Sequence, residues 1–237
     1  MAYPPRDMLR VRLLSLVLVV VAALVSGCDG DEPTVVLLVA DASDTSSRAV
    51  DVDAFTERVE ATCVECRVTV HDAEGDADAQ KRQARQAEAD AADVLVVVPV
   101  EPEGLGTVGG RDLPIVSLGS LVPGSERFVG LESGEVPRQG GSDLEAARDV
   151  LMGDEKSMTY VPTREMSEQA ADLAVAFLAE VPARGGEEVD GVDSWLFRDQ
   201  EVTLDSLTTV LVGQHVLTLD ELCRGGTAKR CARLGLR

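Results

Sequence analysis

The stretch "DADAQKRQARQAEADAADVLVVVPV" (residues 76–100) contains the two patterns from which the fold can be predicted. Its first part is rich in alanine and charged residues, which favour an α-helix over residues 76–93. Its second part, residues 94–100, is a short and nearly continuous apolar run, which is typical of a strand buried on both faces of a sheet. A helix that leads into a buried strand is the repeating unit of an α/β fold with a parallel sheet.

The same alternation continues along the chain on both sides of this unit. Further strands are predicted at residues 34–41, 67–73, 113–119, 127–133 and 157–163, and further helices at residues 51–63, 142–152 and 165–181. Residues 182–193 are predicted to form a loop, followed by an extended segment at 194–203 and two short helices. We therefore expect a parallel sheet with flanking helices, whose ligands bind at the edge where the strands end.

The N-terminal residues 1–27 have the pattern of an export signal. Arg6, Arg10 and Arg12 precede an apolar run at residues 13–26, which is shorter than the ~20 residues of a membrane-spanning helix. Residues 25–28 resemble a bacterial lipobox, which implies cleavage before Cys28 and lipidation of Cys28. An ordinary signal peptide is the alternative. With residues 28–33 as a tether, the expected location is the extracytoplasmic face of the cell membrane.

The chain is strongly acidic, with 22 basic and 42 acidic residues. Removal of residues 1–27 takes away three arginines and Asp7, so 19 basic and 41 acidic residues remain and the net charge becomes −22. Nucleic acids and anionic lipid surfaces are poor partners for a protein with such a charge. The simplest interpretation of the acidic residues is a solubilising surface.

Four cysteines follow Cys28, and outside the cytoplasm an even number favours disulfides. The local solution pairs Cys63 with Cys66 and Cys223 with Cys231, and it is one of three possible pairings. A redox role for the Cys63–Cys66 motif would require it to begin a helix. The motif instead follows a predicted helix and precedes a predicted strand, which favours a structural role.

The histidines give little support to catalysis or metal binding. His71 and His215 are the only two, and neither has ligand spacing to the cysteines. Neither lies near an activated serine or cysteine in the sequence. We therefore expect no metal, no cofactor and no enzymatic activity.

The order of these elements resembles the sugar-binding lipoproteins of bacterial ABC importers, which have the periplasmic binding protein type I fold, and most closely the xylose- and ribose-type members. The resemblance is carried by residues 34–41, 63–101, 113–133, 144–178 and 216–236, which include "LPIVSLGSLVPGSERFVGLES" and "VLTLDELCRGGTAKRCARLGL". It implies a two-lobed fold, a sugar or small polar solute as ligand, and an ABC permease as partner.

The chain is shorter than this resemblance implies. The resemblance implies that most of the second lobe lies between residues 133 and 136, where only two residues stand. The predicted divisions are therefore a first lobe at residues 34–135, a return crossing of helix, strand and helix at 136–181, and a C-terminal segment of a reduced second lobe at 182–237.

The polar residues of the sugar site also depart from the family pattern. Gly119 and Ser120 stand where the resemblance implies an Asp-Arg pair, Val161 replaces a lysine, and Ala49 replaces an aromatic residue. A sugar-binding aspartate would fall on Gly141 or Ser142, next to Asp143. Arg48 alone matches a family sugar contact.

The candidate ligand-binding residues lie mostly in the loops that follow the predicted strands. They are Asp41, Ser43, Asp44, Arg48, Glu101, Ser120 and Asp143. Surface carboxylates present by chance are the alternative in so acidic a chain. Trp195, the single tryptophan, is expected to pack under the C-terminal segment.

The sequence therefore predicts a membrane-anchored lipoprotein related to the binding component of a sugar importer, with weakened or lost sugar binding. Two alternatives are an active sugar receptor that delivers its ligand to a permease, and an interaction module that binds no ligand.

Overall fold

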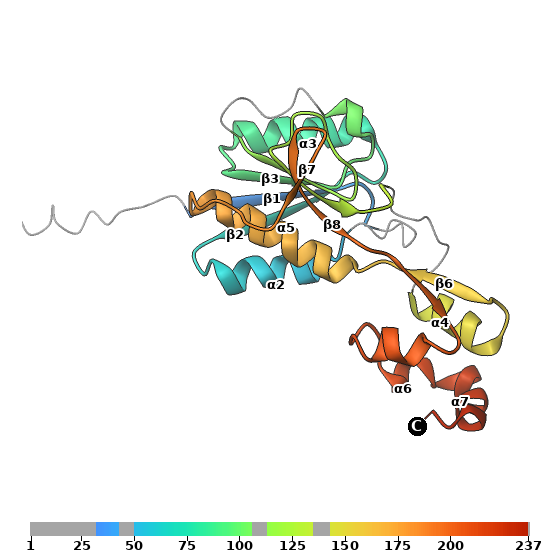
Figure 1. Cartoon of the computed structure of the whole chain (residues 1–237). Coiled ribbons are helices and arrows are strands. Elements are labelled where there is room, and N and C mark those ends of the chain that lie inside the picture. The colour runs from blue at the N-terminus through green and yellow to red at the C-terminus, as the bar shows by residue number, and fades with distance from the viewer. Residues whose placement is uncertain (1–31, 43–49, 106–112, 135–142, 237) are drawn as a thin grey trace, which may run out of the picture. The chain divides into compact units, whose positions relative to one another are not determined.

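The computed structural model describes residues 32–42, 50–105, 113–134 and 143–236, and two sheets organise them (Figure 1). The strands are β1 (Thr34–Val39), β2 (Arg67–Asp72), β3 (Val94–Val97), β4 (Ile115–Leu118), β5 (Arg127–Leu131), β6 (Ser157–Tyr160), β7 (Glu187–Val189), β8 (Val192–Phe197) and β9 (Gln200–Thr203). The α-helices are α2 (Val52–Thr62), α3 (Ala77–Ala89), α4 (Asp143–Met152), α5 (Thr163–Leu178), α6 (Leu219–Leu222) and α7 (Ala228–Leu234). Three short helices complete the set: η1 (Pro102–Gly104), η2 (Thr208–Val212) and η3 (Gly225–Thr227).

The larger sheet has seven strands in the order β2-β1-β3-β4-β5-β8-β7. Six of these strands run parallel, and β7 pairs antiparallel with β8 at one edge. The alternation of helices and buried strands along residues 34–131 therefore predicted the parallel sheet correctly.

Both faces of this sheet are buried, because successive side chains of a strand point to opposite faces. Val36 and Leu38 of β1 pack with Ala84 and Ala87 of α3, whereas Leu37 belongs to a second core. That second core is formed with α2 and α5, and its members include Phe55, Val59, Met166, Ala170 and Leu173. Figure 1 shows α3 on one side of the sheet and α2 and α5 on the other. The continuous valine and leucine runs thus meet the requirement of a sheet covered on both faces.

The smaller sheet consists of β6 and β9, which pair antiparallel. Met158, Tyr160 and Val202 from these strands pack with Ala147, Val150 and Leu151 of α4 and with Leu207, Leu211, Leu222 and Cys231. The protein therefore has one main α/β lobe and a small second lobe, in agreement with the predicted fold class.

The prediction that residues 182–237 all belong to the second lobe is wrong for β7 and β8. Strands β7 and β8 belong to the larger sheet, where β8 lies parallel to β5. The local pattern shows that residues 194–203 are extended, but it carries no information about which strand they pair with. The chain reaches the second lobe again only at β9.

Trp195 packs under residues 184–186 of the predicted C-terminal segment, but in the core of the main lobe. Trp195 lies on β8, and its side chain belongs to the same core cluster as side chains of α5. Its indole Nε1 donates a hydrogen bond of 3.2 Å to the Arg184 carbonyl oxygen. A Cβ atom at Gly186 would approach the indole ring to 3.1 Å, so the loop before β7 passes directly over this ring.

Two disulfides are present, Cys63–Cys66 and Cys223–Cys231, with Cα–Cα distances of 5.3 and 5.7 Å. They are the local pairs among the three possible pairings. Cys63 caps the C-terminus of α2, and β2 begins at Arg67, as expected for a structural link between helix and strand. Cys231 is buried in the core of the second lobe.

The N-terminal predictions lie outside the described residues. These are the signal at residues 1–27, the lipidation of Cys28, and most of the tether. Within the described ranges, no helix has both the length and the apolar character needed to cross a membrane.

Truncation of Phe55 tests the importance of the α2 face of the core. Phe55 is fully buried between α2 and the sheet, so Phe55→Ala should lower the free energy of unfolding by about 3–5 kcal/mol. Urea denaturation followed by circular dichroism measures this change. Val64→Ala is the control, since Val64 is 91% exposed, and its effect should stay within about 0.5 kcal/mol. Equal effects of the two substitutions would contradict this packing.

Candidate functional site

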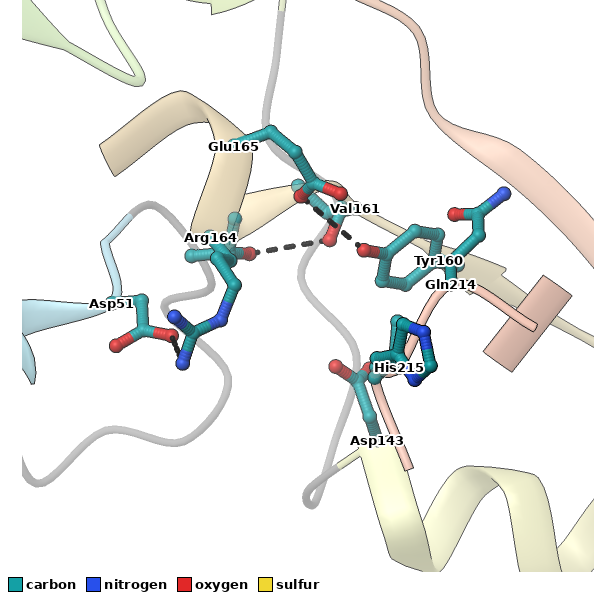
Figure 2. A pocket seen from close by; sticks show the side chains of 10 residues that line it. Asp51, Asp143, Tyr160, Val161, Arg164, Glu165, Gln214 and His215 are labelled. Atoms are coloured by element: carbon teal, nitrogen blue, oxygen red, sulfur yellow. Dashed lines mark hydrogen bonds and ion pairs between the residues drawn. The ribbon is translucent and has the colours of Figure 1, made fainter. Parts of the chain in front are cut away.

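A polar cavity lies where the chain passes from β6 of the second lobe into α5 of the main lobe (Figure 2). Its volume is about 220 Å³. Its lining residues come from both lobes: Asp51, Asp143, Tyr160, Val161, Thr163, Arg164, Glu165, Gln214, His215 and Val216. Cavities at lobe boundaries are common sites for small ligands, so this cavity is the candidate site.

Asp51 forms the main-lobe wall and is held in place by its role as a helix cap. Its Oδ1 accepts a hydrogen bond of 2.9 Å from the Ala54 backbone amide, which satisfies one of the unpaired amides at the start of α2. Its own amide donates to the Ser167 Oγ at 2.8 Å. Asp51 thereby links the N-terminal ends of α2 and α5 at the cavity.

The first turn of α5 supplies a cation and an anion side by side. The Arg164 guanidinium lies 3.6 Å from the Asp51 Oδ2 and 3.7 Å from the Glu168 Oε1. Glu165 points towards Tyr160 in Figure 2. Arg164 is therefore engaged by two carboxylates, and Glu165 faces the other side of the cavity.

Tyr160, the last residue of β6, is buried, and its hydroxyl donates a long hydrogen bond of 3.5 Å to the Glu165 Oε2. Burial raises the pKa of the Tyr160 phenol, and the negative charges of Glu165 and Asp143 raise this pKa further. The phenol therefore lies within the electrostatic field of both carboxylates.

The second lobe closes the cavity with Asp143 and the segment of residues 214–216. Asp143 is the first residue of α4, where the helix dipole favours a negative charge. Gln214 and His215 follow the π-helix η2, and His215 has a left-handed backbone with φ 62°. A Cβ atom at Gly213 would overlap the Thr209 carbonyl oxygen, so the close turn that positions Gln214 and His215 depends on this glycine.

The described part of the cavity lining carries an excess of negative charge. Among the described residues there are three carboxylates, from Asp51, Asp143 and Glu165, and one guanidinium, from Arg164, which gives a net charge of −2 with His215 neutral. Tyr160, Thr163 and Gln214 add groups that can donate and accept hydrogen bonds. Such a lining suits a small polar solute.

The structure gives no indication of a metal centre in the part that it describes. Across residues 32–42, 50–105, 113–134 and 143–236, no group of three or more histidine, cysteine, aspartate or glutamate side chains is arranged to hold a metal ion.

Of the predicted site residues that the structure describes, Asp143 lines this cavity. Asp41, Glu101 and Ser120 follow β1, β3 and β4 at the expected edge of the sheet but are not among the lining residues of the described cavity. Ser43, Asp44 and Arg48 lie outside the described residues. A ligand-binding role for these six residues stays a prediction.

Sequence reasoning missed most of the cavity lining. Tyr160, Arg164 and Glu165 lie within residues 144–178, one of the stretches that resemble sugar-binding lipoproteins. None of the three matches a sugar contact of that family. For Gln214 and His215 the sequence contains one signal. Gly213 stands at the end of an apolar run, and a glycine in this position indicates a turn.

Comparison with solved structures finds the same arrangement in sugar-binding proteins. An ABC transporter solute-binding protein from Clostridium phytofermentans with bound β-D-glucose aligns with TM-score 0.63 and 12% identity, over 80% of this chain and 99% of that chain. A carbohydrate transporter solute-binding protein from Chloroflexus aurantiacus in complex with D-glucose aligns with TM-score 0.62 and 10% identity, over 80% and 97%. The Caulobacter myo-inositol binding protein with bound myo-inositol gives 0.57 and 12%, over 80% and 99%. No protein-family model and no curated protein matches the chain.

The chain has the periplasmic binding protein type I fold. At identities of 10–12% the likeness is one of fold, and the ligands named above belong to those proteins. In this type I fold the main lobe is the seven-stranded sheet with α2, α3 and α5, and the candidate cavity lies at the β6–α5 crossing.

The raised pKa of Tyr160 predicts a stability change in alkaline solution. The folded protein disfavours the phenolate, whereas the unfolded chain ionises near the ordinary value of 10.0. Stability should therefore fall as the pH rises above 10.0 and towards the higher folded pKa, by up to about 1.4 kcal/mol per pH unit. Tyr160→Phe should remove this part of the pH dependence.

Absorbance titration near 295 nm measures the ionisation of the Tyr160 phenol directly. The signal of Tyr160 is the difference between the titration curves of the native chain and of Tyr160→Phe. The midpoint should lie above that of the same difference in concentrated urea. Coincident midpoints would contradict the buried, negatively surrounded position of the hydroxyl.

Proposed function

We propose that this protein is a lipid-anchored, extracytoplasmic solute-binding protein related to the sugar receptors of ABC importers, with weakened or lost affinity for neutral sugars. The observation that carries the proposal is the polar cavity at the crossing between the two lobes of a type I fold. A cavity of about 220 Å³ has the volume of roughly seven liquid water molecules, which suits a ligand of monosaccharide size.

The side chains around the cavity support weakened sugar binding. Val161, where the resemblance to sugar receptors implies a lysine, is buried in the main core and contributes its carbonyl oxygen to Thr163. Tyr160 is the one phenylalanine, tyrosine or tryptophan side chain in the described lining, and its hydroxyl is engaged by Glu165. Sugar sites gain affinity from aromatic surface and from fully paired hydroxyl groups. This lining offers little aromatic surface.

An active sugar receptor is the second candidate, and the ligands of the aligned solved structures favour it. Those proteins hold glucose and myo-inositol. A receptor of this kind would deliver its ligand to an ABC permease. The sugar-binding measurement below separates the two candidates.

An interaction module that binds no ligand has less support. It would require a large exposed apolar patch. The large apolar side chains that are exposed in the described part lie on separate elements: Val64, Val70, Met152, Val181 and Leu234.

Calorimetric titration with the sugars D-glucose and D-xylose and the cyclitol myo-inositol tests the affinity for neutral polyhydroxy ligands. We expect dissociation constants above about 1 mM, equivalent to a binding free energy weaker than about 4 kcal/mol. A micromolar dissociation constant for any of the three would overturn the weakened-binding proposal and establish the sugar receptor.

The lipid anchor is tested by Cys28→Ser. The native chain should incorporate radiolabelled palmitate. It should also sediment with membranes, because a protein that carries more than one acyl chain is stably anchored. Cys28→Ser should incorporate no label. Equal labelling of the two proteins would exclude Cys28 as the lipidation site.

A further inference from the structure

The charges around the cavity are unequally balanced. Arg164, the one cationic side chain of the described lining if His215 is neutral, lies within 4 Å of both Asp51 and Glu168. Asp51 also accepts a hydrogen bond from the start of α2. The positive charge of Arg164 is therefore directed towards the main-lobe wall.

Glu165 and Asp143 place negative charge on the other side of the cavity. The Glu165 Oε2 accepts a hydrogen bond of 3.5 Å from the neutral Tyr160 hydroxyl, which is longer than a strong hydrogen bond to a carboxylate. Both carboxylates act on the same Tyr160 phenol from different elements, since Glu165 is on α5 and Asp143 is on α4. The field that opposes a negative charge at this phenol favours a positive charge beside it.

A neutral hydroxyl group and an ammonium group interact differently with this electrostatic field. A ligand that enters the cavity displaces water from the carboxylates, and a sugar hydroxyl restores a hydrogen bond to a carboxylate but leaves its negative charge without a counter-charge. An ammonium group donates the same kind of hydrogen bond and in addition compensates the negative charge of the carboxylate. The Tyr160 ring, which also lines the cavity, adds the kind of aromatic surface to which cations are attracted.

We propose that the cavity binds a small hydroxylated solute that carries a protonated amine, with the amine between Glu165 and Asp143. This inference rests on the proposed function as a solute-binding protein and names the ligand class for its site. The cavity volume of about 220 Å³ limits the ligand to about one amino-sugar unit. The net charge of −20 of the whole chain acts in the same direction, because it attracts cations and repels anions.

Calorimetric titration with D-glucosamine and D-glucose tests the inference, since the two probes differ only in the group at one carbon. At pH 7 and physiological salt, D-glucosamine should bind at least tenfold more tightly than D-glucose. N-acetyl-D-glucosamine, which keeps the nitrogen without its charge, should bind as weakly as D-glucose.

Substitutions locate the amine within the cavity. Glu165→Gln and Asp143→Asn should each weaken D-glucosamine binding about tenfold, because each removes one charged acceptor. Glu155→Gln and Asp154→Asn remove the same charges from exposed residues of the α4–β6 turn and should leave the affinity unchanged. Thermal unfolding of the four variants shows whether each one is folded.

The outcomes separate this inference from the proposed function. Weak binding of all three probes would overturn the amine inference and leave the weakened affinity for neutral sugars standing. Micromolar binding of D-glucose equal to that of D-glucosamine would overturn both. Tight D-glucosamine binding that all four substitutions weaken equally would assign the effect to the acidic surface and overturn the assignment to this cavity.

Discussion

The larger sheet must be covered on both faces, and the path of the chain depends on how the second face is covered. One face receives α3, which follows β2 directly along the sequence. The other face receives α2 together with α5, and α5 begins only after the chain has formed α4 and β6 in the second lobe. Without α5, buried side chains of β3, β4 and β5 would be exposed to water at a cost of ~25 cal/mol per Å² of apolar surface. The return of the chain from the second lobe is thus a condition for the stability of the main lobe.

The candidate cavity follows from this return. Residues 160–165 must change from a strand to a helix while they pass between lobes, and the first turn of a helix leaves backbone amides unpaired. Pro162 at the N-cap of α5 has no amide to satisfy, and Thr163 donates to the Val161 carbonyl oxygen. The side chain of Val161 meanwhile packs in the main core. One short segment therefore fixes the core and the polar wall of the cavity together, so changes to the ligand site at Val161 also affect packing.

The junction between the lobes is reinforced by a second connection. Arg198, between β8 and β9, donates two hydrogen bonds of 2.9 Å to the Glu132 carboxylate, and the Glu132 amide donates to the Phe197 carbonyl oxygen at 2.8 Å. These residues are separated by more than sixty positions in the sequence. Because both side chains are largely exposed, the ion pair contributes about 1 kcal/mol or less. Its effect is to fix the direction in which the chain leaves the larger sheet for β9.

Local patterns predicted the elements of this fold, whereas pairings between distant residues could not be predicted from them. The valine runs of β1 and β3 and the alanine-rich α3 carry their own periodicity, so the parallel sheet could be inferred. The position of β8 beside β5 depends on the complete three-dimensional arrangement, and for this reason the place of Trp195 in the main-lobe core could not be predicted. The cavity combines Asp51, Tyr160 and His215 from three distant segments, and the sequence spacing of such residues contains no signal of their proximity.

The acidic composition of the chain and the charge of the cavity act on a cationic ligand in two different ways. Long-range attraction concentrates cations near the protein, but it acts over only about 8 Å at physiological salt and does not distinguish one cation from another. Selection requires nearby groups that pair with the charge after its water is lost, and the carboxylates of Glu165 and Asp143 beside the Tyr160 ring are groups of this kind. A neutral sugar benefits from neither effect, because it has no net charge for the field to act on. The surface charge and the cavity charge therefore favour the same class of ligand, the first by raising its local concentration and the second by holding it.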